Sequence, residues 1–132
     1  MHNTILQQFR PLPSNIHPQP QHTRQSHLSY LQGLALSRCD LSGADLSCAD
    51  LTRTRFVGAK MVGTILHEAT IEQCEFFHAD LTDADLTLAD LAGADLSTCS
   101  LLRTQLEKCS LVGAKLAGAD LRSCRMRDAD FS

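Results

Sequence analysis

The chain has 132 residues, of which 43% are apolar and 5% aromatic, and this size suits one small domain rather than a large multidomain enzyme. A net charge of −3 gives no basic excess for binding a phosphate backbone, so we expect no direct nucleic-acid binding. No apolar run is long enough to cross a membrane, and the first residues lack the apolar core of a signal peptide. We therefore expect a soluble protein.

Residues 1–25 form a segment of distinct composition. They contain no acidic residue and hold the four prolines of the chain. Such a polar segment buries too little apolar surface to fold alone, and we predict a flexible tail. An acid-free beginning also loosely resembles the export signals of bacterial secreted effectors, so an exported effector that uses the rest of the chain for binding stands as an alternative to a cytoplasmic protein.

A short capping helix is predicted over residues 26–33. Ser26 can cap its first turn, and Gly33 can end it. Leu28 and Leu31 would then cover the first coil of the region that follows, because a solenoid needs covered ends.

A five-residue repeat fills residues 34–132. From Leu36 to Phe131 every fifth residue is large and apolar without a slip, which gives twenty such positions. Two residues before each of them lies a small side chain, Ala, Cys or Thr, with Leu34 as the exception. A period of five fits neither an amphipathic helix, which needs about 3.6, nor a flat strand, which needs about 2. A chain that turns a corner every five residues does fit.

The triplet Ala-Asp-Leu occurs seven times, for example at residues 44–46 and 89–91. This unit resembles that of the pentapeptide-repeat family, A(D/N)LXX, over residues 34–132. The resemblance implies an all-β fold, a right-handed quadrilateral β-helix in which four pentapeptides, one on each face, make one coil. Twenty units then make about five coils and a rod roughly 24 Å long at the strand spacing.

On this template four stacks of large side chains fill the core. The stacks are Leu36, Phe56, Phe76, Leu96 and Leu116; Leu41, Met61, Leu81, Leu101 and Leu121; Leu46, Leu66, Leu86, Leu106 and Met126; and Leu51, Ile71, Leu91, Leu111 and Phe131. The last member of each stack lies on an open face of the final coil: Leu116, Leu121, Met126 and Phe131. Because strand edges and apolar side chains there invite a partner, we predict an end-to-end homodimer.

No sequence pattern of an enzyme or a cofactor site is present. The chain has no G-x-S-x-G, Walker A, Rossmann or H-E-x-x-H motif. Nine aspartates directly precede large apolar residues, so paired carboxylates arise from the repeat itself, and a convex rod offers no pocket to perturb their pKa values. We predict a non-enzymatic protein without cofactor or metal.

Charge is distributed unevenly along the predicted rod. Residues 40–95 carry eleven acids and three bases, whereas residues 96–132 carry four acids and six bases. Like positions stack in adjacent coils on the template, which places Arg55 beside Glu75 as an exposed pair. The acidic part is either a solvated surface or a surface for a basic partner.

The predicted function is protein–protein interaction or scaffolding through the flat faces, with a protein partner that the sequence does not identify. The candidate partner surface combines outward apolar residues with acids of the same region: Val57, Val62, Phe77, Leu102, Asp80, Asp85, Asp90 and Asp95. Quinolone-resistance members of the family resemble duplex DNA and bind DNA gyrase. The resemblance therefore implies, as an alternative, a DNA-mimicking inhibitor or protector of gyrase, although only half of this rod is acidic.

Composition alone leaves open whether the six cysteines form a disulfide scaffold, a metal site or neither. Five of them replace Ala at the small inward position, and Cys48 alone falls at an outward one. Cys39 and Cys99 share a face but lie three coils apart, about 14 Å, which is beyond disulfide reach. The register thus disfavours both disulfides and zinc, and it favours a reducing compartment such as the cytoplasm.

Overall fold

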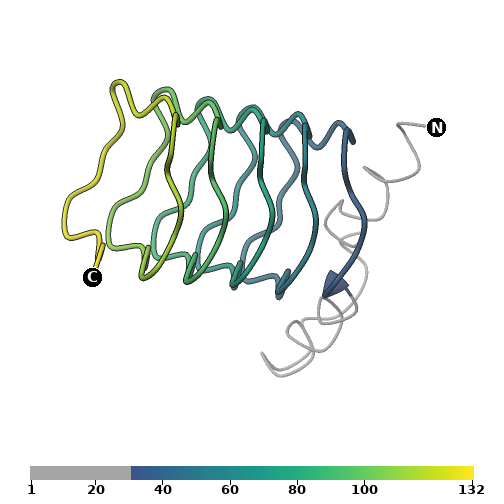
Figure 1. Ribbon diagram of the computed structural model, residues 1–132, viewed down its shortest axis with the longest axis horizontal. Helices are drawn as coiled ribbons and strands as arrows, with labels where there is room; N and C mark the ends of the chain where they lie inside the picture. Colours follow the sequence, from purple (N-terminus) through teal and green to yellow (C-terminus); the bar gives the residue numbers. More distant parts are fainter. Residues whose placement is uncertain (1–30) are drawn as a thin grey trace, which may run out of the picture.

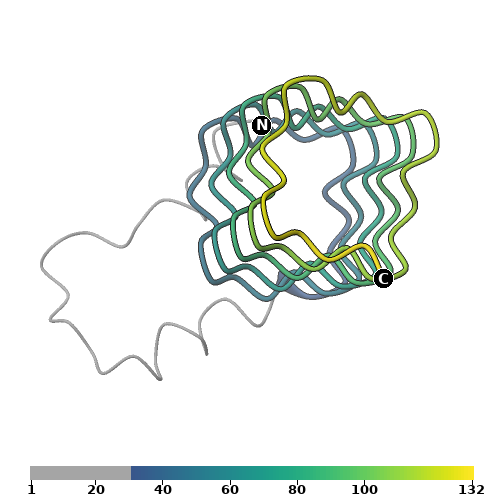
Figure 2. The same ribbon diagram turned by 90° about the vertical axis from the view of Figure 1, so that its left-hand side faces the viewer.

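The structure is a computed structural model that describes residues 31–132, and these wind into a stack of four-sided coils (Figures 1 and 2). Every β-bridge is parallel and joins residues 20 apart, from Ala35–Arg55 to Ser110–Asp130. Four pentapeptides therefore complete one coil. The bridges form one ladder on each face, and we name the faces by their ladder residues: A (35, 55, 75, 95, 115), B (40, 60, 80, 100, 120), C (45, 65, 85, 105, 125) and D (50, 70, 90, 110, 130).

Regular elements in the described part of the chain are minimal. The strands are single bridge residues between turns, and Leu31 alone lies in a 3₁₀ turn. The predicted tail, residues 1–25, and residues 26–30 of the predicted capping helix lie outside the described residues. Leu31 is fully buried and Gly33 donates its N–H to the Thr52 carbonyl at 2.9 Å, so residues 31–33 already share the backbone pattern of the repeat that we expected to begin at 34.

Each corner of a coil is a tight turn. At the corner after Leu41, the N–H of Ala44 donates to the Leu41 carbonyl at 2.9 Å, and Gly43 between them has a φ of +69°. A positive φ at the third residue is the geometry of a type II turn, which glycine adopts without strain. All seven glycines of the chain lie at this corner position, and thirteen non-glycine residues adopt the same positive φ at the other corners within residues 31–132.

In a typical pentapeptide, backbone carbonyls accept four of the five N–H groups, and one N–H has no backbone acceptor. In one unit the N–H groups of Asp85, Leu86 and Leu88 donate to carbonyls of neighbouring coils. The N–H of Ala89 closes the turn on Leu86. Thr87 holds the remaining N–H, and it donates to the Asp85 carboxylate at 2.9 Å. The aspartate thus satisfies the one donor that neither the coils nor the turn can satisfy.

The same Asx turn occurs at all nine aspartates that precede a large apolar residue. Each Oδ1 accepts the backbone N–H two residues further on at 2.9–3.1 Å. Asp favours such turns because its short side chain reaches its own nearby backbone. The recurrence of Asp in the repeat therefore has a structural cause: Asp40, Asp45, Asp50, Asp80, Asp85, Asp90, Asp95, Asp120 and Asp130.

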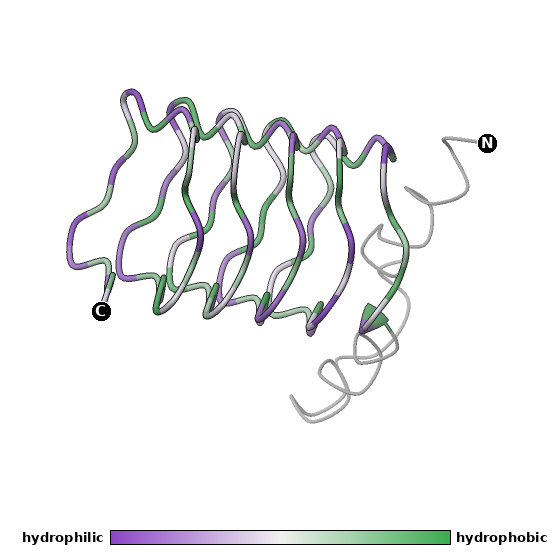
Figure 3. Ribbon diagram, in the orientation of Figure 1, coloured by the Kyte–Doolittle hydropathy of each residue, from purple (hydrophilic) through white to green (hydrophobic). Residues whose placement is uncertain are grey.

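The large apolar residues fill the interior, as the repeat predicts. Those from Leu36 to Leu111 are at most 7% exposed, and Figure 3 shows apolar and polar residues alternating around each coil. The rings of Phe56 and Phe76 stack at 4.9 Å with an interplanar angle of 12°. Within residues 31–132 no buried side-chain nitrogen or oxygen lacks a hydrogen-bond partner, since even the buried Thr54 hydroxyl donates to the Leu31 carbonyl at 2.7 Å.

Candidate functional site

Phe77 is the most prominent side chain of the predicted partner surface. It lies on face A with 42% of its surface exposed, and Val57 holds the equivalent place in the preceding coil. Its ring packs on the His78 ring with centroids 4.1 Å apart. The His78 Nδ1 and the Thr98 hydroxyl share a hydrogen bond of 2.8 Å, which ties this ring to the next coil. Phe77 is thus an exposed aromatic on a supported platform.

The remaining apolar residues of the predicted surface lie on the adjoining face B. Val62 is exposed, whereas Leu102 is half-buried. They lie two coils apart, and Thr82 holds the equivalent place in the coil between them. The Thr82 carbonyl accepts the Gly63 N–H from one neighbouring coil, and the Leu102 carbonyl accepts the Asp83 N–H in the same way one coil further on. The structure therefore groups Val57 with Phe77 but does not join Val62 and Leu102 to the same patch.

The four aspartates of the predicted surface lie on four different faces. Asp80 belongs to face B, Asp85 to face C, Asp90 to face D and Asp95 to face A. All four accept turn N–H groups, and the hydrogen bonds from Ser97 hold the pKa of Asp95 below its usual range. The acids make a band around the rod rather than one flat acidic surface.

Ion pairs run along the ladders and compensate part of this charge. Arg55 Nε lies 3.2 Å from Glu75 Oε2, which confirms the pair expected from the repeat register. Lys115 Nζ lies 3.7 Å from Asp95 Oδ2 on the same face. All four side chains are substantially exposed, so each pair contributes at most about 1 kcal/mol. Around Phe77 the acids of face A therefore carry cations beside them.

The predicted dimer end belongs to the coil of residues 115–132, which lies at the opposite end of the rod from residue 31 (Figure 1). Met126 is 37% and Phe131 is 51% exposed, while Leu116 and Leu121 are half-buried. Leu116 and Leu121 pack against the buried core, whereas Met126 and Phe131 do not belong to it, because only one neighbouring coil of the described chain can cover them.

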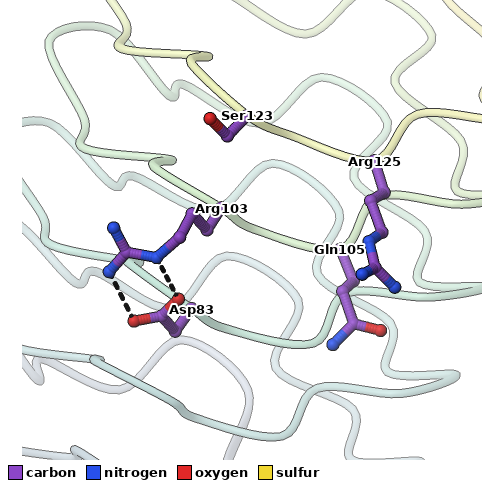
Figure 4. A pocket seen from close by; sticks show the side chains of 5 residues that line it. All are labelled: Asp83, Arg103, Gln105, Ser123 and Arg125. Atoms are coloured by element: carbon purple, nitrogen blue, oxygen red, sulfur yellow. Dashed lines mark hydrogen bonds and ion pairs between the residues drawn. The ribbon is translucent and has the colours of Figure 1, made fainter.

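A groove that sequence reasoning missed lies at the corner between faces B and C (Figure 4). Asp83, Arg103 and Ser123 line one side, and Gln105 and Arg125 line the other. Arg103 Nε and Nη2 bind the two carboxylate oxygens of Asp83 at 2.7 and 2.8 Å. These hydrogen bonds lower the pKa of the Asp83 carboxyl and raise that of Arg103. A step of 20 residues, from 83 to 103 to 123 and from 105 to 125, is the signal that could have found it.

Other kinds of site are absent from the part of the chain that the structure describes. No three His, Cys, Asp or Glu side chains within residues 31–132 are arranged to hold a metal ion. No helix among these residues has the length and apolar character that a membrane crossing requires.

Comparison with known proteins identifies the repeat. A family model of the pentapeptide repeat region matches residues 31–106, and a model of pentapeptide repeats matches residues 99–132. The chain belongs to the pentapeptide-repeat family. No curated protein sequence matches it significantly.

Solved structures agree with this assignment. The pentapeptide repeat protein Rfr23 from the cyanobacterium Cyanothece 51142 is 24% identical, with a TM-score of 0.76 over 77% of this chain and 83% of that one. QnrB1, a plasmid-mediated fluoroquinolone resistance protein, is 21% identical, with a TM-score of 0.58 over 76% of this chain and 64% of that one. Such pentapeptide-repeat proteins form right-handed β-helices, and at these identities the likeness shows the fold alone.

Proposed function

We propose that this pentapeptide-repeat protein is a non-enzymatic interaction module that presents face A to a protein partner. The observation that supports it is the exposure of Phe77 at a position that holds Ser37, Ser97 and Ala117 in other coils of the same face. Large aromatic side chains contribute much of the binding free energy of protein interfaces. Val57 extends the apolar contact along the rod.

The platform beneath Phe77 suits it to this role. Packing on His78 and the hydrogen bond between His78 and Thr98 restrict the ring before any partner arrives. A preorganised side chain loses less entropy on binding, so more of its contact free energy appears as affinity. The pairs Arg55–Glu75 and Asp95–Lys115 give the patch a polar, nearly neutral rim, so the expected partner surface is apolar at its centre.

Affinity capture from the native host tests this proposal. The bait is the intact chain, compared with Phe77→Asp and with the matched control Val112→Asp, which places the same charge at an exposed apolar position on face D. We expect one protein to be retained by the wild type and by Val112→Asp and lost with Phe77→Asp. Equal retention by Phe77→Asp, with an unchanged circular dichroism spectrum, would remove face A as the binding surface.

A DNA-mimicking inhibitor or protector of gyrase is the second candidate. The excess of acids over bases in residues 40–95 and the likeness of fold to QnrB1 support it. The acids of this region lie on all four faces of the rod and recur from coil to coil along its axis, as phosphate charges recur along a DNA duplex. A gyrase supercoiling assay decides the matter, because the absence of both inhibition and protection from a quinolone at excess protein eliminates this candidate. A cytoplasmic location is part of both proposals.

We also propose that the coil of residues 115–132 mediates an end-to-end homodimer. Met126 and Phe131 would lose their exposed apolar surface in such a contact, and the ladder residues of that coil would gain a second neighbour. Light scattering at micromolar concentration should give twice the chain mass, and Phe131→Asp should give a monomer. A monomeric wild type refutes the dimer.

A further inference from the structure

We propose that face C binds an amphipathic α-helix of a partner protein that presents a basic, apolar, basic row to the rod. The centre of the site is Ile65, the one large apolar side chain at a ladder position within residues 31–132. Its ladder neighbours in the preceding and following coils are Asp45 and Asp85. Ile65 is 38% exposed, so an apolar side chain is open to a partner between two carboxylates. Face C lies opposite face A in the coil, and the proposal does not depend on the function proposed for Phe77.

Two further exposed apolar side chains border Ile65. Val62 lies in the turn that enters face C in the same coil. Leu88, which is 45% exposed, lies in the turn that leaves face C in the next coil. The apolar area therefore extends over the width of one face and two adjacent coils, which is enough to receive more than one apolar side chain of a helix.

The surroundings of this apolar area are acidic. Face C and its two corners are formed in three successive coils by residues 42–48, 62–68 and 82–88, which hold four acids and no Lys or Arg. One acid is compensated by the coil that follows, because Arg103 binds Asp83. Three acids of these stretches have no ion pair with a Lys or Arg within residues 31–132: Asp45, Glu68 and Asp85. The complementary partner surface is therefore basic around an apolar centre.

Asp45 and Asp85 each keep one carboxylate oxygen for a partner. Their Oδ1 atoms accept the turn N–H groups of Ser47 and Thr87. Their Oδ2 atoms accept no hydrogen bond within residues 31–132. Because the turn hydrogen bonds hold both carboxylates against the backbone, a Lys or Arg of the partner meets an oxygen that is already oriented.

The spacing of the row matches an α-helix that lies along the rod. Ladder residues of adjacent coils are about 4.8 Å apart, so Asp45 and Asp85 are about 9.6 Å apart with Ile65 midway. In an α-helix, residues i, i+3 or i+4 and i+7 share one face, and i and i+7 are about 10.5 Å apart along the axis. Basic residues at i and i+7 can therefore reach the two aspartates while an apolar residue between them covers Ile65. In an extended strand the side chains of one face recur at about 6.6 Å, which does not match this row.

Arg125 bounds the site toward the C-terminal end of the rod. On ladder C, Asp85 is followed by Gln105 and then by Arg125. A helix shifted by two coils would bring one base over Asp85 and the other over Arg125, and the second contact is repulsive. The charges of face C thus confine a basic helix to the coils that carry Ile65 and its neighbours.

The test uses a synthetic helical peptide of about five turns as the probe. It has Lys at i and i+7 and Leu at i+3 and i+4 on one face, with Ala and Gln elsewhere. The control probe has the same composition in an order that distributes Lys and Leu around the helix. Fluorescence anisotropy with the full chain at fixed ionic strength gives both dissociation constants. We expect the first peptide to bind at least about fivefold more tightly than the control probe.

Variants of the rod locate the binding surface. Asp85→Asn keeps an oxygen acceptor for the turn and should weaken binding about threefold, whereas Asp90→Asn makes the same change on face D and should be nearly neutral. Ile65→Thr should weaken binding about tenfold, because it removes apolar contact surface, and the ladder of the same coil already holds Thr70. Val112→Thr, at an exposed apolar position on face D, is its control and should leave the affinity unchanged. Circular dichroism verifies that each variant keeps the fold.

Three results would overturn the proposal. They are the absence of saturable binding of the first peptide, equal binding of the two peptides, and an equal loss of affinity in Asp85→Asn and Asp90→Asn. Light scattering without peptide tests a second copy of the chain as the occupant. A mass that falls in Ile65→Thr but not in Val112→Thr would assign face C to self-association and would contradict the helix.

Discussion

The ladder positions of two neighbouring coils carry charges of opposite sign on the same backbone. The coil of residues 55–74 has Arg, Lys, Ile and Thr at its four ladder positions, whereas the coil of residues 75–94 has Glu and three Asp. Both have buried stacks, the same turns and the same positive φ at every corner. The comparison shows that the inward residues determine the fold and that the ladder residues are free to vary.

The difference between the two coils lies in one backbone donor on each of the faces B, C and D. In the coil of residues 75–94, aspartate carboxylates accept the N–H groups of Thr82, Thr87 and Ala92. In the coil of residues 55–74 no aspartate is present at a ladder position, and the equivalent N–H groups of Val57 and Val62 donate to no group within residues 31–132. Asp is therefore a local stabiliser that a coil can lose, which leaves its outward positions open to selection for binding.

The largest expected effect is on the interior that both coils share. Replacing Phe76 by Ala removes a fully buried ring and should lower the free energy of unfolding by about 3–5 kcal/mol, and Phe56→Ala should cost about the same. Phe77→Ala, one residue away and exposed, should change it by less than about 0.5 kcal/mol. Urea denaturation followed by circular dichroism measures all three. A costly Phe77→Ala would show that the outward positions also determine the fold.

Acid should destabilise the rod through its hydrogen-bonded carboxylates. The side-chain and backbone hydrogen bonds from Arg122 lower the pKa of Asp120 to about 2, and those from Ser132 lower the pKa of Asp130. Because these values lie below the unfolded value of about 3.9, the stabilisation is complete above about pH 4 and is lost as the pH falls toward 2. Thermal unfolding at pH 6, 4, 3 and 2 measures it, and a constant midpoint would contradict it.

A single turn aspartate should have a smaller effect. Asp85→Ala leaves the Thr87 N–H without its carboxylate and should cost about 1 kcal/mol. Asp85→Asn keeps an oxygen acceptor in place and should cost clearly less. Gln105→Ala, on the same ladder without a turn bond, is the matched control and should be nearly neutral. Equal losses for Asp85→Ala and Gln105→Ala would deny the aspartates their structural role.

Thiol labelling compares the inward and outward positions of the coils without altering stability. Burial raises the pKa of Cys74 and Cys99 to about 12 and that of Cys109 to about 11, so these thiols should react slowly. Cys48 is exposed at a corner and should react first with a maleimide at pH 8. Peptide mapping by mass spectrometry identifies the labelled site, and rapid labelling of Cys99 would be inconsistent with the register.

The interior could be predicted from the sequence because a solenoid buries residues by spacing alone. Leu66, Ile71 and Phe76 are each fully buried, as their five-residue spacing predicts. The same spacing also placed Cys74 and Cys99 inside and Cys48 outside. No long-range contact had to be guessed, since the contacts recur every 20 residues.

The surface could not be predicted as completely, because each step of five residues turns the chain onto the next face. Asp80, Asp85 and Asp90 are close in sequence, yet they lie on three different faces. The groove, conversely, joins Arg103 to Arg125 across a corner and between coils. The structural role of the corner glycines was also missed, although their spacing in multiples of five was visible in the sequence.

The uniformity of the coils has a consequence for how a partner finds its place. A ligand that recognised only the repeating backbone and its small polar side chains could bind at several heights, each shifted by one coil of about 4.8 Å. These equivalent positions would give several bound states, and no single geometry of the complex would dominate. Phe77 interrupts the polar column of face A at one height, so a partner that needs an aromatic contact can settle in one placement only.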